Sequence, residues 1–163
     1  MGVEIERKFL LKDDSWRSSI TETFNIVQGY LSRDPDRTVR VRRRGDEAFL
    51  TIKGRAAPAE DGGAPVTPEF EYAIPAADAD KLLALCLPGA IAKTRHIVMH
   101  DGHKWEIDVF SGDNAGLVMA ELELKTAAEA FTRPAWLGTE VTGDHRYSNA
   151  ALAATPFKSW PKA

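Results

Sequence analysis

The sequence predicts an α+β protein that is mainly β, with an antiparallel sheet that closes into a barrel around a charged tunnel. Charged and apolar residues alternate along most extended segments, so each strand has one charged face and one apolar face. The charged faces hold few of the neutral polar residues that usually fill a solvated face. Three helical patterns could cover the apolar faces, which point outward once the sheet closes.

Size and composition suit one domain spanning residues 1–163. The chain has 163 residues, 44% hydrophobic and 28% charged, which is an ordinary globular composition. Its net charge of −3 gives no overall attraction to nucleic acid or acidic membranes, so we expect neither as a partner. Cys86 is the single cysteine and the N-terminus has no apolar leader, which favours a cytoplasmic location. We expect a monomer or a homodimer.

The first strand shows the alternation: Glu4, Glu6 and Lys8 share one face, and Ile5 and Phe9 share the other. Later segments repeat this pattern. In chain order, their charged faces carry Arg40, Arg42 and Arg44; Lys53; Glu69 and Glu71; Lys93 and Arg95; Glu106 and Asp108; and Glu121, Glu123 and Lys125. The complete set balances eight basic residues against eight acidic ones.

Three segments have helical patterns. Asp13 and Asp14 could cap a helix that runs through Trp16 and Ile20. The segment Ala76–Leu87 has a leucine stripe that ends at a Pro-Gly pair, and His145–Ala154 follows a Gly-Asp pair. The Ala-, Gly- and Pro-rich segment Gly54–Pro68 is expected to be a loop, either a simple connection or a lid over the tunnel mouth.

The charges are segregated by strand, which points to the chemistry of the tunnel. Like charges so close together repel each other unless a counter-ion lies between them. Rows of arginines suit a polyanion, and paired carboxylates suit a divalent cation. The pattern therefore predicts a site for a metal-bound polyphosphate, with a simple sheet that has one solvated face as the alternative.

The segment Glu4-Ile5-Glu6-Arg7-Lys8 resembles the ExExK signature of the CYTH domain, or triphosphate tunnel metalloenzyme, superfamily. Further similar segments follow in order over nearly the whole chain. They are Gln28-Gly29-Tyr30-Leu31, Arg40-Val41-Arg42, Leu50-Thr51-Ile52-Lys53-Gly54, Glu69-Phe70-Glu71-Tyr72, Lys93-Thr94-Arg95, Trp105-Glu106-Ile107-Asp108, Glu121-Leu122-Glu123-Leu124, Trp136-Leu137-Gly138 and Arg146-Tyr147.

The resemblance implies an eight-stranded antiparallel tunnel that binds a linear triphosphate or a triphosphate-bearing compound together with Mg²⁺ or Mn²⁺. The bacterial members that this N-terminus resembles look most like inorganic triphosphatases, which cleave tripolyphosphate to diphosphate and phosphate. A class IV adenylyl cyclase, a thiamine triphosphatase and a non-catalytic polyphosphate-binding module remain alternatives. An enzyme should lose turnover when Glu6 is replaced by Gln, whereas a binding module should keep or gain affinity.

The resemblance and the chemistry of phosphoryl transfer together suggest a role for each charged residue. Phosphate oxygens would be bound by Lys8, Arg40, Arg42, Lys53 and Arg95, with Glu71 orienting the basic residues. Lys93 is the candidate for stabilising the leaving phosphate. The expected metal ligands are Glu4, Glu6, Asp108, Glu121 and Glu123. The Glu4/Glu6 pair, or alternatively the Glu121/Glu123 pair, could take the proton of the attacking water.

One position departs from the family pattern. Related bacterial sequences usually have a basic residue two positions before the Glu69–Glu71 segment, where this chain has Thr67. One anion contact could therefore be absent, or Arg55 could supply it. The departure bears on the preferred length of the substrate.

Overall fold

The computed structural model describes residues 2–161, and most of them belong to one β-sheet. Its strands are β1 (Val3–Leu11), β2 (Ile20–Asp34), β3 (Arg37–Arg44), β4 (Glu47–Lys53), β5 (Val66–Ile74), β6 (Ile91–His100), β7 (His103–Phe110), β8 (Val118–Glu123) and β9 (Leu137–Glu140). The α-helices are α1 (Ala76–Leu85) and α2 (Asn149–Ala154). Short 3-10 helices are η1 (Ser15–Ser19), η2 (Gly112–Asn114), η3 (His145–Tyr147) and η4 (Phe157–Ser159).

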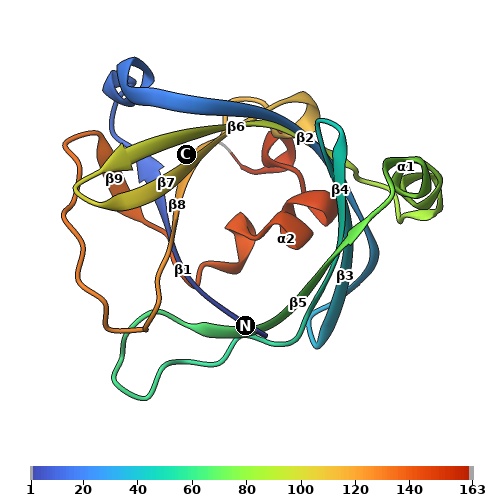
Figure 1. Ribbon diagram of the computed structural model, residues 1–163, viewed down its shortest axis with the longest axis horizontal. Helices are drawn as coiled ribbons and strands as arrows, with labels where there is room; N and C mark the ends of the chain where they lie inside the picture. The colour runs from blue at the N-terminus through green and yellow to red at the C-terminus, as the bar shows by residue number, and fades with distance from the viewer. Residues whose placement is uncertain (1, 162–163) are drawn as a thin grey trace.

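The sheet closes into a barrel, as the charge alternation and the family resemblance predict. The strand order is β5-β4-β3-β2-β6-β7-β8-β1-β9, and every pairing is antiparallel. An additional pairing between β5 and β1, with Val3 opposite Pro68, joins the ends of eight strands. Viewed down the short axis of the molecule, these strands form a ring (Figure 1). β9 is an extra strand beside β1.

The outer faces of the strands are apolar and are packed under other segments over much of the barrel, whereas Phe70 and Tyr72 on β5 stay exposed. Phe9, Trp105 and Leu122 are buried in one cluster with Trp16 of η1 and Trp136, which lies just before β9. Over β3 and β4, helix α1 covers Val41 and Ala48. These outer clusters hold the strands in register with the charged side chains facing inward, because a slip of one residue would exchange the two faces.

Helix α1 ends earlier than the leucine stripe predicts. The helix stops at Leu85, and Leu85 and Leu87 are 72% and 41% exposed, so neither belongs to a buried stripe. The Leu87 N–H instead donates to the carbonyl oxygen of Tyr30 on β2. Pro88 disfavours helical geometry at Leu87, and Cys86 before it is already extended, with φ −67° and ψ 155°.

The other two helix predictions were partly wrong. Residues 15–19 form the 3-10 helix η1 and Ile20 already begins β2, while Asp13 accepts hydrogen bonds from Ser15 instead of capping an α-helix. The predicted His145–Ala154 helix is divided into η3 and α2. Ser148 separates them and caps α2 by accepting a hydrogen bond from the Ala151 N–H.

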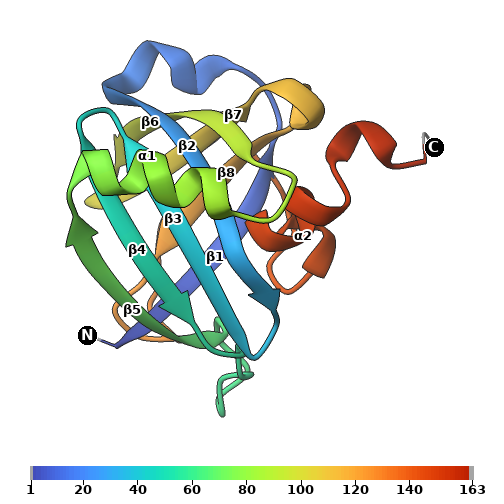
Figure 2. The same ribbon diagram turned by 90° about the vertical axis from the view of Figure 1, so that its right-hand side faces the viewer.

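Helix α2 covers one end of the barrel. Figure 1 shows it across the centre of the ring, and Figure 2 shows it on the right, beside the end of β2. The inner face is apolar at this end: Leu10, Phe110 and Met119 cluster with Leu152 of α2. This apolar packing lies between α2 and the charged part of the interior.

The predicted loop is shorter than the sequence pattern indicates. Residues 66–68 belong to β5 and close the barrel against β1, so the connection covers only residues 54–65. Its Ala64 is buried, and its N–H donates to the carbonyl oxygen of Ala127. Among residues 2–161, no helix is long and apolar enough to span a bilayer.

Candidate active site

The strand register brings the predicted site residues to the inner face of the barrel. Residues directly opposite each other on neighbouring strands share a face. The register places Lys8 opposite Glu121, Glu6 opposite Glu123, and Glu121 opposite Glu106. It continues around the ring with Arg95 opposite Asp108, Lys53 opposite Glu69, Arg40 opposite Thr51, and Arg42 opposite Gln28.

Arg42 is a half-buried cation that lacks a carboxylate partner among the described residues. Its Nε donates to the side-chain oxygen of Gln28 at 2.8 Å, a neutral acceptor. Burial and the nearby charges of Arg40 and Arg95 lower the pKa of Arg42 to about 9. A guanidinium gives up its proton only with great difficulty, so this shift indicates positive charge that a bound anion would neutralise.

Lys93 and Asp108 form a fully buried ion pair. The Lys93 Nζ lies 2.7 Å from Oδ2 of Asp108, and both side chains are 0% exposed. Arg95 donates to both oxygens of the same carboxylate, at 2.8 and 2.9 Å. Although burial favours a neutral acid, these two cations lower the pKa of Asp108. Burial lowers the pKa of Lys93 to about 7, with Arg95 and Arg42 acting in the same direction against the attraction of Asp108.

Further carboxylates lie next to this group, and Glu121 Oε2 is 3.5 Å from Nη2 of Arg95. Burial, followed by the charges of Glu121 and Glu4, raises the pKa of Glu6 well above its ordinary value. The Oε1 of Glu121 is buried and accepts no hydrogen bond among the described residues. Lys8 lies between the two acids, but its Nζ is 3.7 Å from Glu6 and 3.9 Å from Glu121. This group therefore carries negative charge that its neighbours neutralise only in part.

Lys53 connects the acids of β1 and β5. Its Nζ is 2.8 Å from Oε1 of Glu4 and 3.4 Å from Oε2 of Glu69. Burial raises the pKa of Glu69 to about 7, and the charge of Glu4 adds to this effect. Glu123 lies at the end of β8, where it is exposed to solvent. Partial burial of its carboxyl group, together with the charges of Glu4 and Glu106, nevertheless raises its pKa.

The observed ion pairs bear on two of the predicted roles. Glu71 accepts a hydrogen bond from Thr51 at 2.8 Å and lies 3.5 Å from Arg40, a position from which it can orient that arginine. Both oxygens of Asp108 are engaged by Lys93 and Arg95, so the carboxylate would have to give up a cation to bind a metal. The metal-ligand role of Asp108 stays a prediction. Within residues 2–161, no group of three or more His, Cys, Asp or Glu side chains is arranged so that it could hold a metal ion.

The basic residue absent at position 67 is not replaced by Arg55. Thr67 lies opposite Glu4 on the inner face, but Arg55 is exposed and pairs with Asp36 at 2.6 Å. Arg44 pairs with Glu47 and stacks near Phe24 and Phe49. Lys125 lies beyond the end of β8 and is exposed.

Sequence reasoning missed two polar residues of the interior, Gln28 and Asn149. Gln28 is 0% exposed, and its Nε2 donates to Oδ1 of Asn149 at 3.2 Å. The same Asn149 oxygen accepts from Lys93 at 3.1 Å. Gln28 has the alternation of an inner-face residue, with Ile26 and Tyr30 on the same side of β2, and this signal could have found it. Asn149 had no such signal, because its place depends on how α2 docks.

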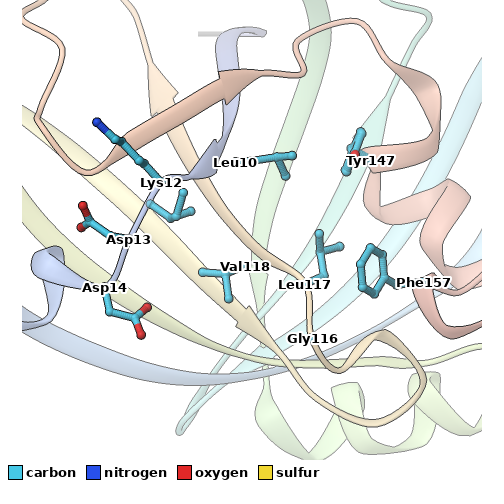
Figure 3. Close-up of a pocket in the computed structure, with 10 residues that line it drawn as sticks. Leu10, Lys12, Asp13, Asp14, Gly116, Leu117, Val118, Tyr147 and Phe157 are labelled. Atoms are coloured by element: carbon cyan, nitrogen blue, oxygen red, sulfur yellow. The ribbon is translucent and has the colours of Figure 1, made fainter. Parts of the chain in front are cut away.

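A surface groove of about 650 Å³ lies outside the charged interior (Figure 3). It is lined mainly by apolar side chains of β1, β8 and the C-terminal segment, including Leu10, Val118 and Phe157, with Asp13 and Asp14 at one side. None of the predicted site residues lines it. The chemistry is therefore sought inside the barrel, where the charged groups converge.

A closed antiparallel barrel whose inner face is lined by bases and carboxylates defines a class of proteins that can hold a polyanion together with a cation. The CYTH domain family matches residues 2–153, and the chain belongs to this family.

Two relatives and one crystal structure extend the comparison. An inorganic triphosphatase of Acetivibrio thermocellus is 40% identical over 98% of this chain and 99% of its own length. An inorganic triphosphatase of Nitrosomonas europaea is 36% identical over 92% of this chain and 96% of its own. The crystal structure of an inorganic triphosphatase has 34% identity and a TM-score of 0.63, covering 98% of this chain and all of that one.

Proposed function

We propose that this protein hydrolyses inorganic triphosphate to diphosphate and phosphate inside its barrel, with Mg²⁺ or Mn²⁺ as cofactor. The observation that carries the proposal is an inner face lined by bases and carboxylates whose charges are only partly neutralised by their ion pairs. Arg42 has a neutral partner, and Glu6 faces the like charges of Glu4 and Glu121. The similarity to inorganic triphosphatases over nearly the whole chain supports the same activity.

The basic residues of the interior are suited to bind and align the phosphates. Arg40, Arg42 and Arg95 offer planar groups that donate paired hydrogen bonds, and Lys8 and Lys53 offer compact charges. Phosphoryl transfer depends chiefly on such alignment and on charge neutralisation. Lys93, buried beside Arg95, would donate to the leaving phosphate and stabilise its developing charge.

The carboxylate group fits a divalent cation. The Oε1 of Glu121 is buried and has no hydrogen-bond donor within residues 2–161, and the pKa of Glu6 is raised by burial and by neighbouring acids. Carboxylate oxygens are the ligands that Mg²⁺ and Mn²⁺ prefer. Glu4, Glu6, Glu121 and Glu123 would hold the ion, and Asp108 would keep Lys93 and Arg95 in place. When bound, such an ion supplies positive charge against the phosphate oxygens and a more acidic water.

The decisive experiment measures phosphate release from tripolyphosphate, ATP and thiamine triphosphate with Mg²⁺, with Mn²⁺ and with EDTA. We expect metal-dependent cleavage of tripolyphosphate, with slower cleavage of the two larger compounds. No release from tripolyphosphate would refute the proposal. Detection of cyclic AMP from ATP would indicate a cyclase instead.

The substitution Glu6→Gln separates an enzyme from a binding module. In an enzyme, loss of this carboxylate should lower turnover by at least about 10-fold, while tripolyphosphate still binds to the basic residues. In a binding module there is no turnover to lose, and affinity should stay equal or rise. Glu22→Gln, an exposed change on β2, serves as the matched control and should leave both quantities unchanged.

A further inference from the structure

We propose that Asn149, the first residue of α2, is a positioning residue that aims the ammonium group of Lys93 at the leaving phosphate. The inference rests on the proposed function and extends it to a residue outside the barrel strands. It follows from a chain of hydrogen bonds that runs from α2 into the charged interior.

The side-chain oxygen of Asn149 joins two strands. It accepts from Nζ of Lys93 on β6 at 3.1 Å and from Nε2 of Gln28 on β2 at 3.2 Å. The other end of the Gln28 amide accepts from Nε of Arg42 on β3 at 2.8 Å. One asparagine thus connects the proposed leaving-group lysine with a proposed phosphate-binding arginine.

The geometry at Lys93 explains why this oxygen matters. An ammonium group has three N–H donors. Asp108 and Asn149 take two of them, at 2.7 and 3.1 Å, and so fix the direction of the third. Because the stem of a lysine is flexible, removal of either acceptor would let the group turn away from the phosphate.

The place of Asn149 in α2 supports a role in the interior over a local one. Ser148 already caps the helix by accepting from the Ala151 N–H, so the Asn149 side chain is not needed there. The apolar packing of Leu152 and Ala153 anchors α2 against the end of the barrel. The helix is therefore a fixed support from which Asn149 reaches Lys93.

The test compares Asn149→Ala and Asn149→Asp with the wild type in the tripolyphosphate assay. Asn149→Ala should lower kcat by about 10- to 100-fold with a smaller change in KM, because misplacement of a reacting group acts on the chemical step. Asn149→Asp keeps an oxygen acceptor for Lys93 and Gln28. This variant should recover most of kcat, although its negative charge should raise KM for the anionic substrate.

Asn114→Ala is the matched control for structural damage. Asn114 is buried, and its Oδ1 accepts from the Phe157 N–H at 2.9 Å, outside the charged interior. We expect this variant to lower the melting temperature at least as much as Asn149→Ala while its kcat stays near the wild-type value.

Three results would overturn the inference. One is a wild-type kcat in Asn149→Ala, and another is an equal loss of kcat in Asn114→Ala. The third is an Asn149→Asp variant that is no more active than Asn149→Ala. If the wild type itself fails to cleave tripolyphosphate, the proposed function falls and this inference falls with it. An active wild type with an unaffected Asn149→Ala variant contradicts only the positioning role.

Discussion

At the level of single residues, the buried charged side chains of the interior are stable only beside oppositely charged partners. Lys93, Arg95 and Asp108 are nearly excluded from solvent, and each is stabilised by the opposite charge beside it. Burying a charge costs free energy that only close partners offset. Removal of one member therefore leaves the others buried without a partner and lowers the free energy of unfolding.

Asp108→Asn should be strongly destabilising. The change leaves Lys93 and Arg95 buried without their shared carboxylate, which is expected to lower the free energy of unfolding by about 3–5 kcal/mol. Urea denaturation measures this loss. Asp80→Asn is the control, since Asp80 forms a similarly close pair with Arg43 on the surface, at 2.7 Å, and its loss should change stability much less. Equal effects of the two substitutions would contradict the buried-pair argument.

At the level of elements, α2 depends on a close approach by the α1–β6 connection. Gly89 has a φ of +103°, and a Cβ there would lie 2.0 Å from the carbonyl oxygen of Ala153 on α2. A glycine is required at this point because backbone meets backbone without room for a side chain. The seating of α2, and with it the position of Asn149, thus depends on a residue of another connection.

Gly89→Ala should displace α2 and reduce both stability and activity. Gly102→Ala is a matched control: its φ is +82°, but a Cβ there would meet nothing within 4 Å. The control should cost only backbone strain, about 1–2 kcal/mol, and should leave turnover intact. Thermal melting and tripolyphosphate hydrolysis measure the two effects. Retention of full activity in Gly89→Ala would show that the position of α2 does not matter for the chemistry.

At the level of the whole molecule, the barrel concentrates opposing charges whose repulsion is relieved by protons or by ligands. Glu6 and Glu69 have raised pKa values, whereas Asp108 has a lowered one and that of Glu121 is lowered to about 2. Ionisation of Glu6 and Glu69 therefore destabilises the folded protein, whereas ionisation of Asp108 and Glu121 stabilises it. The metal-free protein should therefore respond to pH in two opposite ways.

The free energy of unfolding should fall as pH rises from about 5 to about 7. The ordinary pKa of Glu69 is 4.5 and its folded value is about 7, so the folded protein binds more protons than the unfolded one between these values. Glu69→Gln should flatten this slope in thermal melts made without metal. At acidic pH the direction reverses: as pH falls below the ordinary pKa values of Asp108 and Glu121, the free energy of unfolding should decrease because these two carboxylates become protonated. An unchanged slope in Glu69→Gln would contradict the assignment.

Tripolyphosphate with Mg²⁺ should stabilise the folded protein more than either does alone. Ligand at about 100 times its Kd adds about 2.7 kcal/mol, which corresponds to roughly 5–10 °C in melting temperature for a chain of this size. Differential scanning fluorimetry with each component alone and with both tests this. Orthophosphate at equal ionic strength is the control for simple screening. No shift with saturating ligand would argue strongly against a binding site inside the barrel.

Period-two alternation was enough to predict the strand faces and the closed barrel, because it records which side of each strand carries the charges and which the apolar packing. It placed Glu6, Arg42 and Lys93 on the charged face before any contact was known. Which charges meet became known only from the folded chain: Asp108 pairs with Lys93 and Arg95, Arg55 stays outside, and α2 brings Asn149 to Lys93. Such pairings depend on register and on helix docking, which join residues far apart in the chain and leave no local pattern.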